Sequence, residues 1–215
     1  MKVIPREARR ITYSSEIRNL KSLPFDKRQL AVIVGSILGD GCLMSNWSRT
    51  NYRLQIRHSV DQKDYLIWKY KILKKWILSK PKFYEKTNSL TVKTISHPQL
   101  TQLWNKFYPK GKKMIPSDIS ELVQNPLTLA VWFMDDGNIV SKRNGYIHGY
   151  HLNTQSFTSL ENQSLISSLK TIHGIECSVQ KNNGYTRLFI RAQSRNRFVS
   201  LVKRYIIQSM KYKLG

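Results

Sequence analysis

The feature that most restricts the fold of this chain is an internal repeat. Residues 27–40 and residues 127–136 are apolar segments that end in aspartate, and a glycine follows each of them. Their final residues, Asp40 and Asp136, lie 96 positions apart. Each segment has the hydrophobic pattern of a helix buried on more than one side, and the glycine is a typical helix stop signal. The sequence therefore predicts two similar units in one polypeptide.

The residues after each apolar segment predict the same succession twice: strand, strand, helix, strand, strand, helix. Asp26 and the pair Asn125–Pro126 are suitable N-terminal signals for the two apolar helices. The expected fold class is therefore α+β. In the first half we expect strands at 42–46, 52–58, 82–84 and 89–95, and further helices at 62–77 and 99–107. In the second half we expect strands at 138–141, 146–155, 177–180 and 186–192, and further helices at 160–173 and 195–207.

This organisation predicts four parts along the chain. We expect a basic N-terminal extension at 1–26, a first repeat at 27–113, a linker at 114–125 and a second repeat at 126–215. The connection is placed there because proline and glycine recur through residues 109–126, as is typical of turns and loops.

The charge of the chain indicates the class of partner. It has 36 Lys and Arg against 13 Asp and Glu, a net charge of +23 that is spread along the whole sequence. A hydrophobic content of 40% is enough for a buried core, so the basic residues belong to a folded body. Such a body usually binds a polyanion, and nucleic acid is the first expectation; a merely basic, soluble surface is the alternative.

Several other classes are disfavoured. No run of 18 apolar residues predicts a membrane span, and the charged start has no secretory signal. The two cysteines cannot form a disulfide framework, and the His148–His151 pair has no nearby cysteine pair to complete a zinc site. With only four alanines, the Lys-, Asn- and Ile-rich chain suggests an AT-rich genome, compatible with an organelle such as a mitochondrion or chloroplast.

The aspartates that end the two apolar segments, Asp40 and Asp136, are unusual for a basic protein. Each lies at the C-terminal end of a helix, where the macrodipole disfavours a carboxylate by about 0.3–1 kcal/mol. One such aspartate could be an ordinary turn residue, but two at equivalent positions favour function. If the two apolar helices pack side by side, as Gly35 and Ala130 would permit, Asp40 and Asp136 come together. With Asp135 beside them, they would form the hard-oxygen site that Mg²⁺ prefers.

The two apolar segments and the residues that follow them resemble the motifs of a known family. IVGSILGDG, residues 33–41, and LAVWFMDDG, residues 129–137, resemble the two LAGLIDADG motifs of single-chain homing endonucleases. The segments KKMIP, LNTQSF and MKYKL resemble the intron-encoded, yeast-mitochondrial type of that family. The resemblance runs from about residue 27 to the end of the chain.

The resemblance implies two αββαββα units packed through their motif helices, with curved antiparallel sheets forming a saddle over double-stranded DNA. It implies Asp40 and Asp136 as catalytic, metal-binding carboxylates, with Gly39 and Asp135 as neighbouring metal contacts. Mg²⁺ is the expected ion, and Mn²⁺ is expected to substitute. Hydrolysis would leave a staggered double-strand break.

Two lysines complete the catalytic set that the resemblance implies. Lys113 lies 73 residues after Asp40, and Lys213 lies 77 residues after Asp136. They correspond to the basic residue that family members place near each scissile phosphate, where it stabilises developing charge. Lys112 and Lys211 are the nearest competitors for these roles.

Polar side chains that alternate along the predicted strands are candidates for DNA contacts, because a β surface fits the major groove. For each one, a solvated strand face is the alternative reading. The candidates are Arg53, Gln55, Arg57, Lys82, Tyr84, Lys86, Asn153, Gln155, Arg187 and Arg191.

The leading interpretation is a monomeric, site-specific DNA endonuclease. An RNA maturase that assists splicing of its host intron, with that intron RNA as partner, is one alternative. A non-cleaving DNA-binding derivative is another. The target sequence does not follow from these patterns, because it depends on side-chain geometry and DNA deformation along a long interface.

Overall fold

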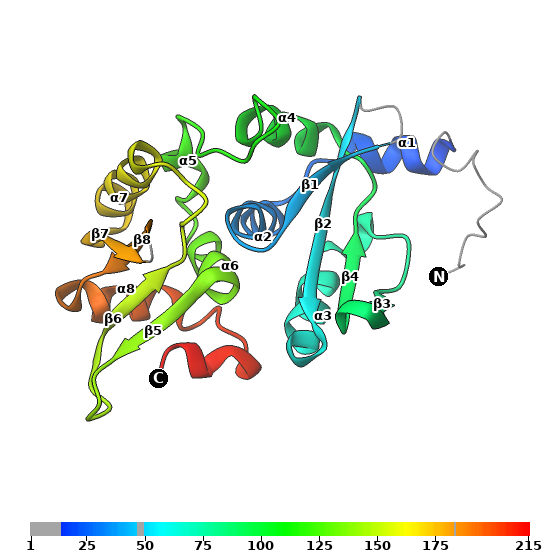
Figure 1. The fold of residues 1–215 in the computed structure, drawn as a ribbon. Coiled ribbons are helices and arrows are strands. Elements are labelled where there is room, and N and C mark those ends of the chain that lie inside the picture. Colours follow the sequence, from blue (N-terminus) through cyan, green and yellow to red (C-terminus); the bar gives the residue numbers. More distant parts are fainter. Residues whose placement is uncertain (1–13, 47–49, 183) are drawn as a thin grey trace. The chain divides into compact units, whose positions relative to one another are not determined.

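The computed structural model describes residues 14–46, 50–182 and 184–215. The elements follow the twofold succession that the sequence predicts (Figure 1). The first half contains α2 (Lys27–Leu38), β1 (Cys42–Ser45), β2 (Tyr52–Ser59), α3 (Lys63–Leu73), β3 (Lys82–Tyr84), β4 (Ser89–Lys93) and α4 (Pro98–Phe107). The second half contains α6 (Pro126–Asp136), β5 (Gly137–Ser141), β6 (Ile147–Leu152), α7 (Ser159–His173), β7 (Cys177–Asn182), β8 (Tyr185–Ile190) and α8 (Arg195–Val202). The α+β fold class is confirmed.

The described chain divides into two compact units. One holds the described residues up to Leu30 together with Asp40–Asn105, and the other holds Ala31–Gly39 together with Lys106–Gly215. Helix α2 therefore begins in the first unit, while its greater part belongs to the second. The division into an extension, two repeats and a linker remains a prediction, and residues 1–13 of that extension lie outside the described residues.

The sheet of the first unit has the strand order β1-β2-β4-β3, and every neighbouring pair is antiparallel. Helix α3 packs against β2 and β4 (Figure 1). Along β2, Leu54 and Ile56 are buried while Arg57 is exposed, as the alternation of the sequence predicts. The opposite face of this sheet is thus available to polar side chains.

The sheet of the second unit repeats this topology with the order β5-β6-β8-β7. Helix α7 contacts β7 and β8, whereas α8 contacts β6 and α6. An aromatic cluster holds these layers together: Phe133 of α6 lies 5.4 Å from Tyr150 and 5.0 Å from Phe198, measured between ring centroids. Edge-to-face contacts of this kind add stability beyond the area that they bury.

Both motif helices are surrounded by protein, as their composition predicts. Residues 31–38 of α2 and residues 127–134 of α6 are all buried. The predicted N-terminal signals are also confirmed. The side chain of Asn125 accepts a hydrogen bond from the Leu127 amide, and Asp26 exchanges two hydrogen bonds with Gln29 in a capping box. Among the described residues, no helix has the length and apolar character needed to cross a bilayer.

Among the described residues, two short α-helices were not predicted. Helix α1 (Ser15–Ser22) lies in the expected basic extension, and α5 (Ile119–Leu122) lies in the expected linker. The segment around α1 is fixed by residues far along the chain: the Trp76 indole donates to the Leu20 carbonyl, and a ring nitrogen of His97 lies 3.0 Å from the Leu23 carbonyl. Local pattern alone does not reveal contacts of this range.

Several predicted boundaries are wrong because sheet pairing and packing end the elements earlier. Strand β6 ends at Leu152, where its pairing with β8 stops, and β8 itself ends at Ile190. Helix α8 ends at Val202 rather than residue 207, and a short 3₁₀ turn at residues 74–76 follows α3.

The glycine after the second motif acts differently from the stop signal that we predicted. Gly137 follows α6 in extended conformation, with φ −86°, so its freedom to adopt positive φ is not used. Instead, a Cβ at this position would collide with the ring of Phe133. Glycine is needed there for close packing.

Candidate functional site

The motif carboxylates lie at the ends of the two apolar helices. Helix α2 ends at Leu38, so Asp40 lies in the turn beyond it, with a side chain that is 42% exposed. Helix α6 continues through both of its acids, and the side chains of Asp135 and Asp136 are half-buried. Each acid is close to the negative end of a helix dipole, which disfavours an isolated carboxylate and favours a bound cation.

Within the second unit, the C-terminal half of α2 packs tightly against α6. A Cβ at Gly35 would lie 2.6 Å from the Thr128 carbonyl oxygen and 2.7 Å from Cβ of Val131. A Cβ at Gly39 would lie 2.7 Å from an Asp135 carboxylate oxygen. Glycine is therefore required at both positions, and Gly39 is bonded directly to Asp40.

The two predicted lysines make equivalent contacts. Nζ of Lys113 donates to the Gly39 carbonyl at 3.0 Å. Nζ of Lys213 donates to the Asp135 carbonyl at 3.1 Å and to the Met134 carbonyl at 2.5 Å. Since Gly39 and Asp135 each precede a motif aspartate, the structure places one ammonium group beside the end of each motif.

Glu161, which the sequence reasoning missed, anchors the segment that carries Lys113. Its carboxylate accepts a hydrogen bond from the Ile115 amide at 2.7 Å and two more from Thr158. Burial alone would raise the pKa of Glu161, but these hydrogen bonds, with the charge of Lys112, outweigh it and lower the pKa. The capping box of α7 was the signal that could have identified this residue.

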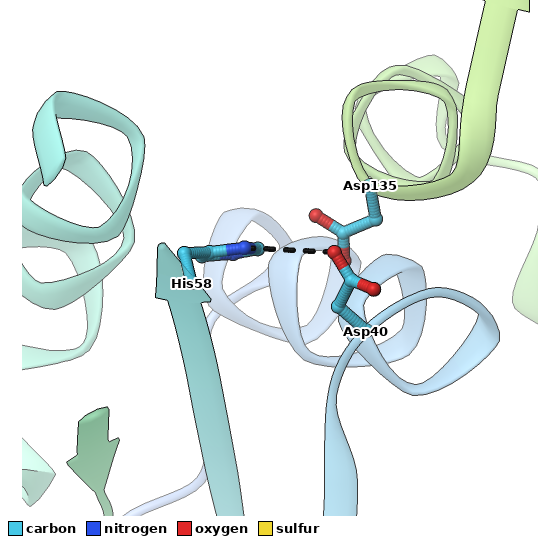
Figure 2. A group of neighbouring side chains, drawn as sticks. All are labelled: Asp40, His58 and Asp135. Atoms are coloured by element: carbon cyan, nitrogen blue, oxygen red, sulfur yellow. Dashed lines mark ion pairs between the residues drawn. The ribbon is translucent and has the colours of Figure 1, made fainter. Parts of the chain in front are cut away.

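His58 is a second residue that the sequence reasoning missed. It lies near the end of β2, and its Nδ1 is 3.5 Å from a carboxylate oxygen of Asp40 (Figure 2). Its side chain is 1% exposed. The available signal was a polar residue on the apolar face of a strand.

On the first sheet, two predicted DNA contacts, Arg57 and Lys82, lie close to the aromatic ring of a third, Tyr84. The guanidinium of Arg57 lies 5.2 Å from the ring centroid of Tyr84, and Nζ of Lys82 lies 5.0 Å from it. Arg57 also donates to the Thr91 hydroxyl at 3.1 Å. These contacts place two positive charges where a phosphate or a base edge can meet them.

On the second sheet, side chains form a continuous hydrogen-bonded chain. His151 Nε2 lies 2.8 Å from the Gln180 amide oxygen, and its Nδ1 lies 3.3 Å from the Asn138 amide nitrogen. The amide of Asn153 donates to Asn138, and Gln155 donates to Asn153. This order of donors and acceptors requires a neutral ring with its proton on Nε2. Burial, with the charge of Arg187, lowers the pKa of His151 and favours that form.

The other predicted contacts are dispersed, and some occupy different elements from those expected. Arg53 and Gln55 are half-buried on β2, and Arg187 is half-buried on β8. Lys86 lies in a 3₁₀ turn after β3, and Arg191 follows the end of β8. The last two are therefore not strand residues, and neither are Asn153 and Gln155, because β6 ends before them.

The fold and these motif ends define a family. The sequence profile of the LAGLIDADG DNA endonuclease family matches residues 30–198, and the chain belongs to that family of homing endonucleases. The family and fold that the motifs predict are therefore confirmed.

Particular relatives sharpen this assignment. The chain is 31% identical to a probable intron-encoded endonuclease of Wickerhamomyces canadensis over 203 residues, covering 87% of this chain and 84% of that one. It is 27% identical to the cytochrome b mRNA maturase bI2 of Debaryomyces hansenii over 204 residues, covering 89% and 75%. A solved structure of the homing endonuclease I-WcaI, bound to its DNA recognition sequence, superposes with a TM-score of 0.84 at 27% identity, covering 94% and 93%.

Proposed function

We propose that the protein is a site-specific endonuclease that makes a staggered double-strand break in a long DNA target by metal-dependent hydrolysis. One observation carries the proposal: each motif ends in an aspartate, and a lysine contacts the carbonyl just before it. Both components can lower the barrier to phosphodiester hydrolysis, because carboxylates hold a cation and positive charge stabilises the developing phosphorane.

The donor atoms at the motif ends fit a hard divalent cation. The carboxylates of Asp40 and Asp136 are the proposed ligands, with Asp135 and the carbonyl of Gly39 as further oxygen donors, and these ligand types suit Mg²⁺ or Mn²⁺. When bound, the metal lowers the pKa of a water and stabilises the leaving oxygen. Lys113 and Lys213, held by backbone carbonyls, keep their ammonium groups near this chemistry.

The two sheets supply the proposed DNA interface, to which the protein would bind as a monomer. The residues that carry this proposal are Arg57, Lys82 and Tyr84 on the first sheet and the hydrogen-bonded polar side chains around His151 on the second. A net charge of +23 makes phosphate contacts a large part of affinity. If about ten phosphates are contacted, log affinity falls with log salt at a slope of roughly −9; a flat dependence would exclude this account.

A second candidate function is an RNA maturase acting on a host intron, because one relative is named as an mRNA maturase. The aspartates alone do not separate the two, since a maturase can retain them. A non-cleaving DNA-binding derivative is the third possibility. An organelle remains the predicted location.

The test uses two DNA probes: the recognition sequence of I-WcaI and a duplex library selected on this protein. Purified protein is incubated with each probe, with Mg²⁺ or with EDTA. We expect cleavage of a selected duplex only with metal, and binding without cleavage for Asp40→Asn and Asp136→Asn. Binding of duplexes without cleavage in any divalent metal would indicate the DNA-binding derivative. Tight binding of the intron RNA with no DNA cleavage would indicate the maturase.

A further inference from the structure

Lys69 of α3 is an ionisable residue in the core of the first unit, where it is 0% exposed. Its Nζ lies 3.2 Å from Nε2 of His58 and 4.4 Å from the ring centroid of Tyr65. Lysine is almost never fully buried unless it is paired, because an ammonium group loses its hydration there. An apolar side chain would pack in this position without that cost, so the contacts of the lysine are of interest.

His58 links this buried lysine to the first motif. Leu54, Ile56 and His58 are the buried positions of β2, so the imidazole occupies a core site at the end of the strand. Its Nε2 faces Lys69, while its Nδ1 lies 3.5 Å from a carboxylate oxygen of Asp40 (Figure 2). A single ring therefore lies between a buried lysine and a partly exposed carboxylate.

The chemistry of the lysine determines which ring nitrogen carries the proton. A protonated Lys69 donates hydrogen bonds and accepts none, so Nε2 of His58 is the acceptor when the lysine carries its charge. The proton of the neutral ring is then on Nδ1, the nitrogen that faces Asp40. The ring of Tyr65, whose centroid lies 4.9 Å from that of His58, packs beside the imidazole and restricts its rotation.

We propose that Lys69 and His58 are positioning residues that hold the Asp40 carboxylate in one orientation. Lys69 fixes the Nδ1–H form of His58, and His58 directs that N–H at Asp40. The inference rests on the proposed function, in which Asp40 is a metal ligand. Replacing a group that orients a metal ligand, without itself binding the metal, commonly lowers metal affinity by about 10–100-fold.

The two equivalent positions in the second half, which the structure describes, do not repeat this pair. Equivalent strand registers pair Cys42 with Gln55 and Asn138 with His151, so the position matching His58 is Thr154. The position matching Lys69, eleven residues further on, is Leu165, which is fully buried. We therefore expect the Lys69–His58 pair to orient the aspartate of the first motif and to have no effect on the aspartate of the second.

The first experiment reads the ring directly and needs neither metal nor DNA. ¹⁵N shifts of labelled histidine rings distinguish the two neutral forms, and His58→Asn assigns the His58 signals among the five histidines. We expect the Nδ1–H form in the wild type and a mixture, or the other form, in Lys69→Met. An Nε2–H ring in the wild type, a doubly protonated ring, or shifts unchanged by Lys69→Met would overturn the proposal.

The second experiment measures Mn²⁺ binding by electron paramagnetic resonance of the free ion. His58→Asn keeps an N–H near the Nδ1 position, whereas His58→Gln moves its amide towards the Nε2 position. We expect affinity within about threefold of wild type for the first and a loss of about tenfold or more for the second. Thr154→Val, the matched control in the second half, should change nothing. Equal losses for His58→Asn and His58→Gln would indicate a merely structural role and refute the proposal.

The outcomes also separate this inference from the proposed function. If Asp40→Asn leaves Mn²⁺ affinity unchanged, Asp40 is not a metal ligand and the proposed function is wrong at this residue. The proposed role of Lys69 and His58 is then wrong as well, whatever the ring spectra show. If Asp40→Asn weakens Mn²⁺ binding but His58→Gln does not, the proposed function stands and the proposed positioning role of Lys69 and His58 is wrong. Thermal unfolding of each variant verifies that it is folded.

Discussion

The two motif helices end differently although they occupy equivalent places in a repeat. The first motif ends in Gly39 and Asp40, which lie beyond the end of α2 at Leu38, whereas α6 continues through Asp135 and Asp136. Gly39 and Asp135 are equivalent positions, yet a side chain at Gly39 would overlap that of Asp135. Gly35 and Val131 form a second such pair, with the same result. When equivalent positions of two helices face each other, a large residue on one requires a small residue on the other.

The two sheets differ in a similar way. They share strand order, but the first presents Arg57 and Lys82 around an aromatic ring, while the second presents a chain of amides around His151. Backbone hydrogen bonding is indifferent to these side chains, so the topology is kept while the recognition surfaces diverge. The comparison predicts that the halves have unequal roles, and the following experiments test where the equivalence ends.

The largest expected effect tests the equivalence of the catalytic acids. Asp40→Asn and Asp136→Asn should each slow DNA cleavage by about a thousand-fold, the upper range for one essential electrostatic group. Asp135→Asn should cost only about tenfold, because Asp135 is proposed as a neighbour of the principal ligands. Single-turnover cleavage, with gel-shift binding as control, measures this. A larger loss for Asp135→Asn than for Asp136→Asn would show that the motifs are not matched at these residues.

The next effect compares the two lysines. Lys113→Met and Lys213→Met should each slow cleavage by about a hundred-fold. Lys213→Met should also lower thermal stability more, since Lys213 bonds two carbonyls and Lys113 bonds one. The exposed neighbours provide matched controls, and Lys112→Met and Lys211→Met should cleave at near wild-type rates. If Lys112→Met slows cleavage as much as Lys113→Met, or Lys211→Met as much as Lys213→Met, the catalytic lysine of that motif is wrongly assigned.

A third prediction concerns the close approach of α2 to α6. Gly-to-Ala substitution normally stabilises a helix by up to about 1 kcal/mol. Gly35→Ala should instead destabilise by about 1–3 kcal/mol, because its Cβ would meet Val131 and a backbone oxygen. Adding Val131→Ala should recover part of the loss, but not all of it, since the backbone oxygen stays. Urea unfolding in a double-mutant cycle measures the coupling, and simple additivity would contradict the packing argument.

The smallest expected effect is a pH dependence of stability that arises from the buried thiol of Cys177. Burial, with the charge of Glu176, raises the pKa of the Cys177 thiol from 9.0 to about 12. Between these two pH values the unfolded chain loses the thiol proton while the folded chain retains it. The contribution of this thiol to the free energy of unfolding is therefore fully present below pH 9 and is lost as the pH rises. The slope is at most about 1.4 kcal/mol per pH unit. Above pH 9, the unfolding free energy should fall less steeply with pH for Cys177→Val than for the wild type, and equal slopes would contradict this prediction.

Much of the fold was predictable because its signals are local. The Asn125 cap, the capping box of Asp26 and the apolar motif helices depend on residues within a few positions of one another. Helix α1 was missed because it is fixed by Trp76 and His97, which are distant in sequence. The strand ends after Leu152 and Ile190 were missed because they depend on where a partner strand stops.

The sequence by itself determined the repeat, the element order, the family and the identity of the acidic and basic residues at the motifs. Only the tertiary structure decided which side chains meet. It brought Lys113 to Gly39 across 74 residues and Lys213 to Asp135 across 78. It also placed Lys69 against His58, a pairing that no motif indicates. The physical reason is that hydrophobic periodicity and capping are encoded locally, whereas a contact between distant residues depends on the packing of every element between them.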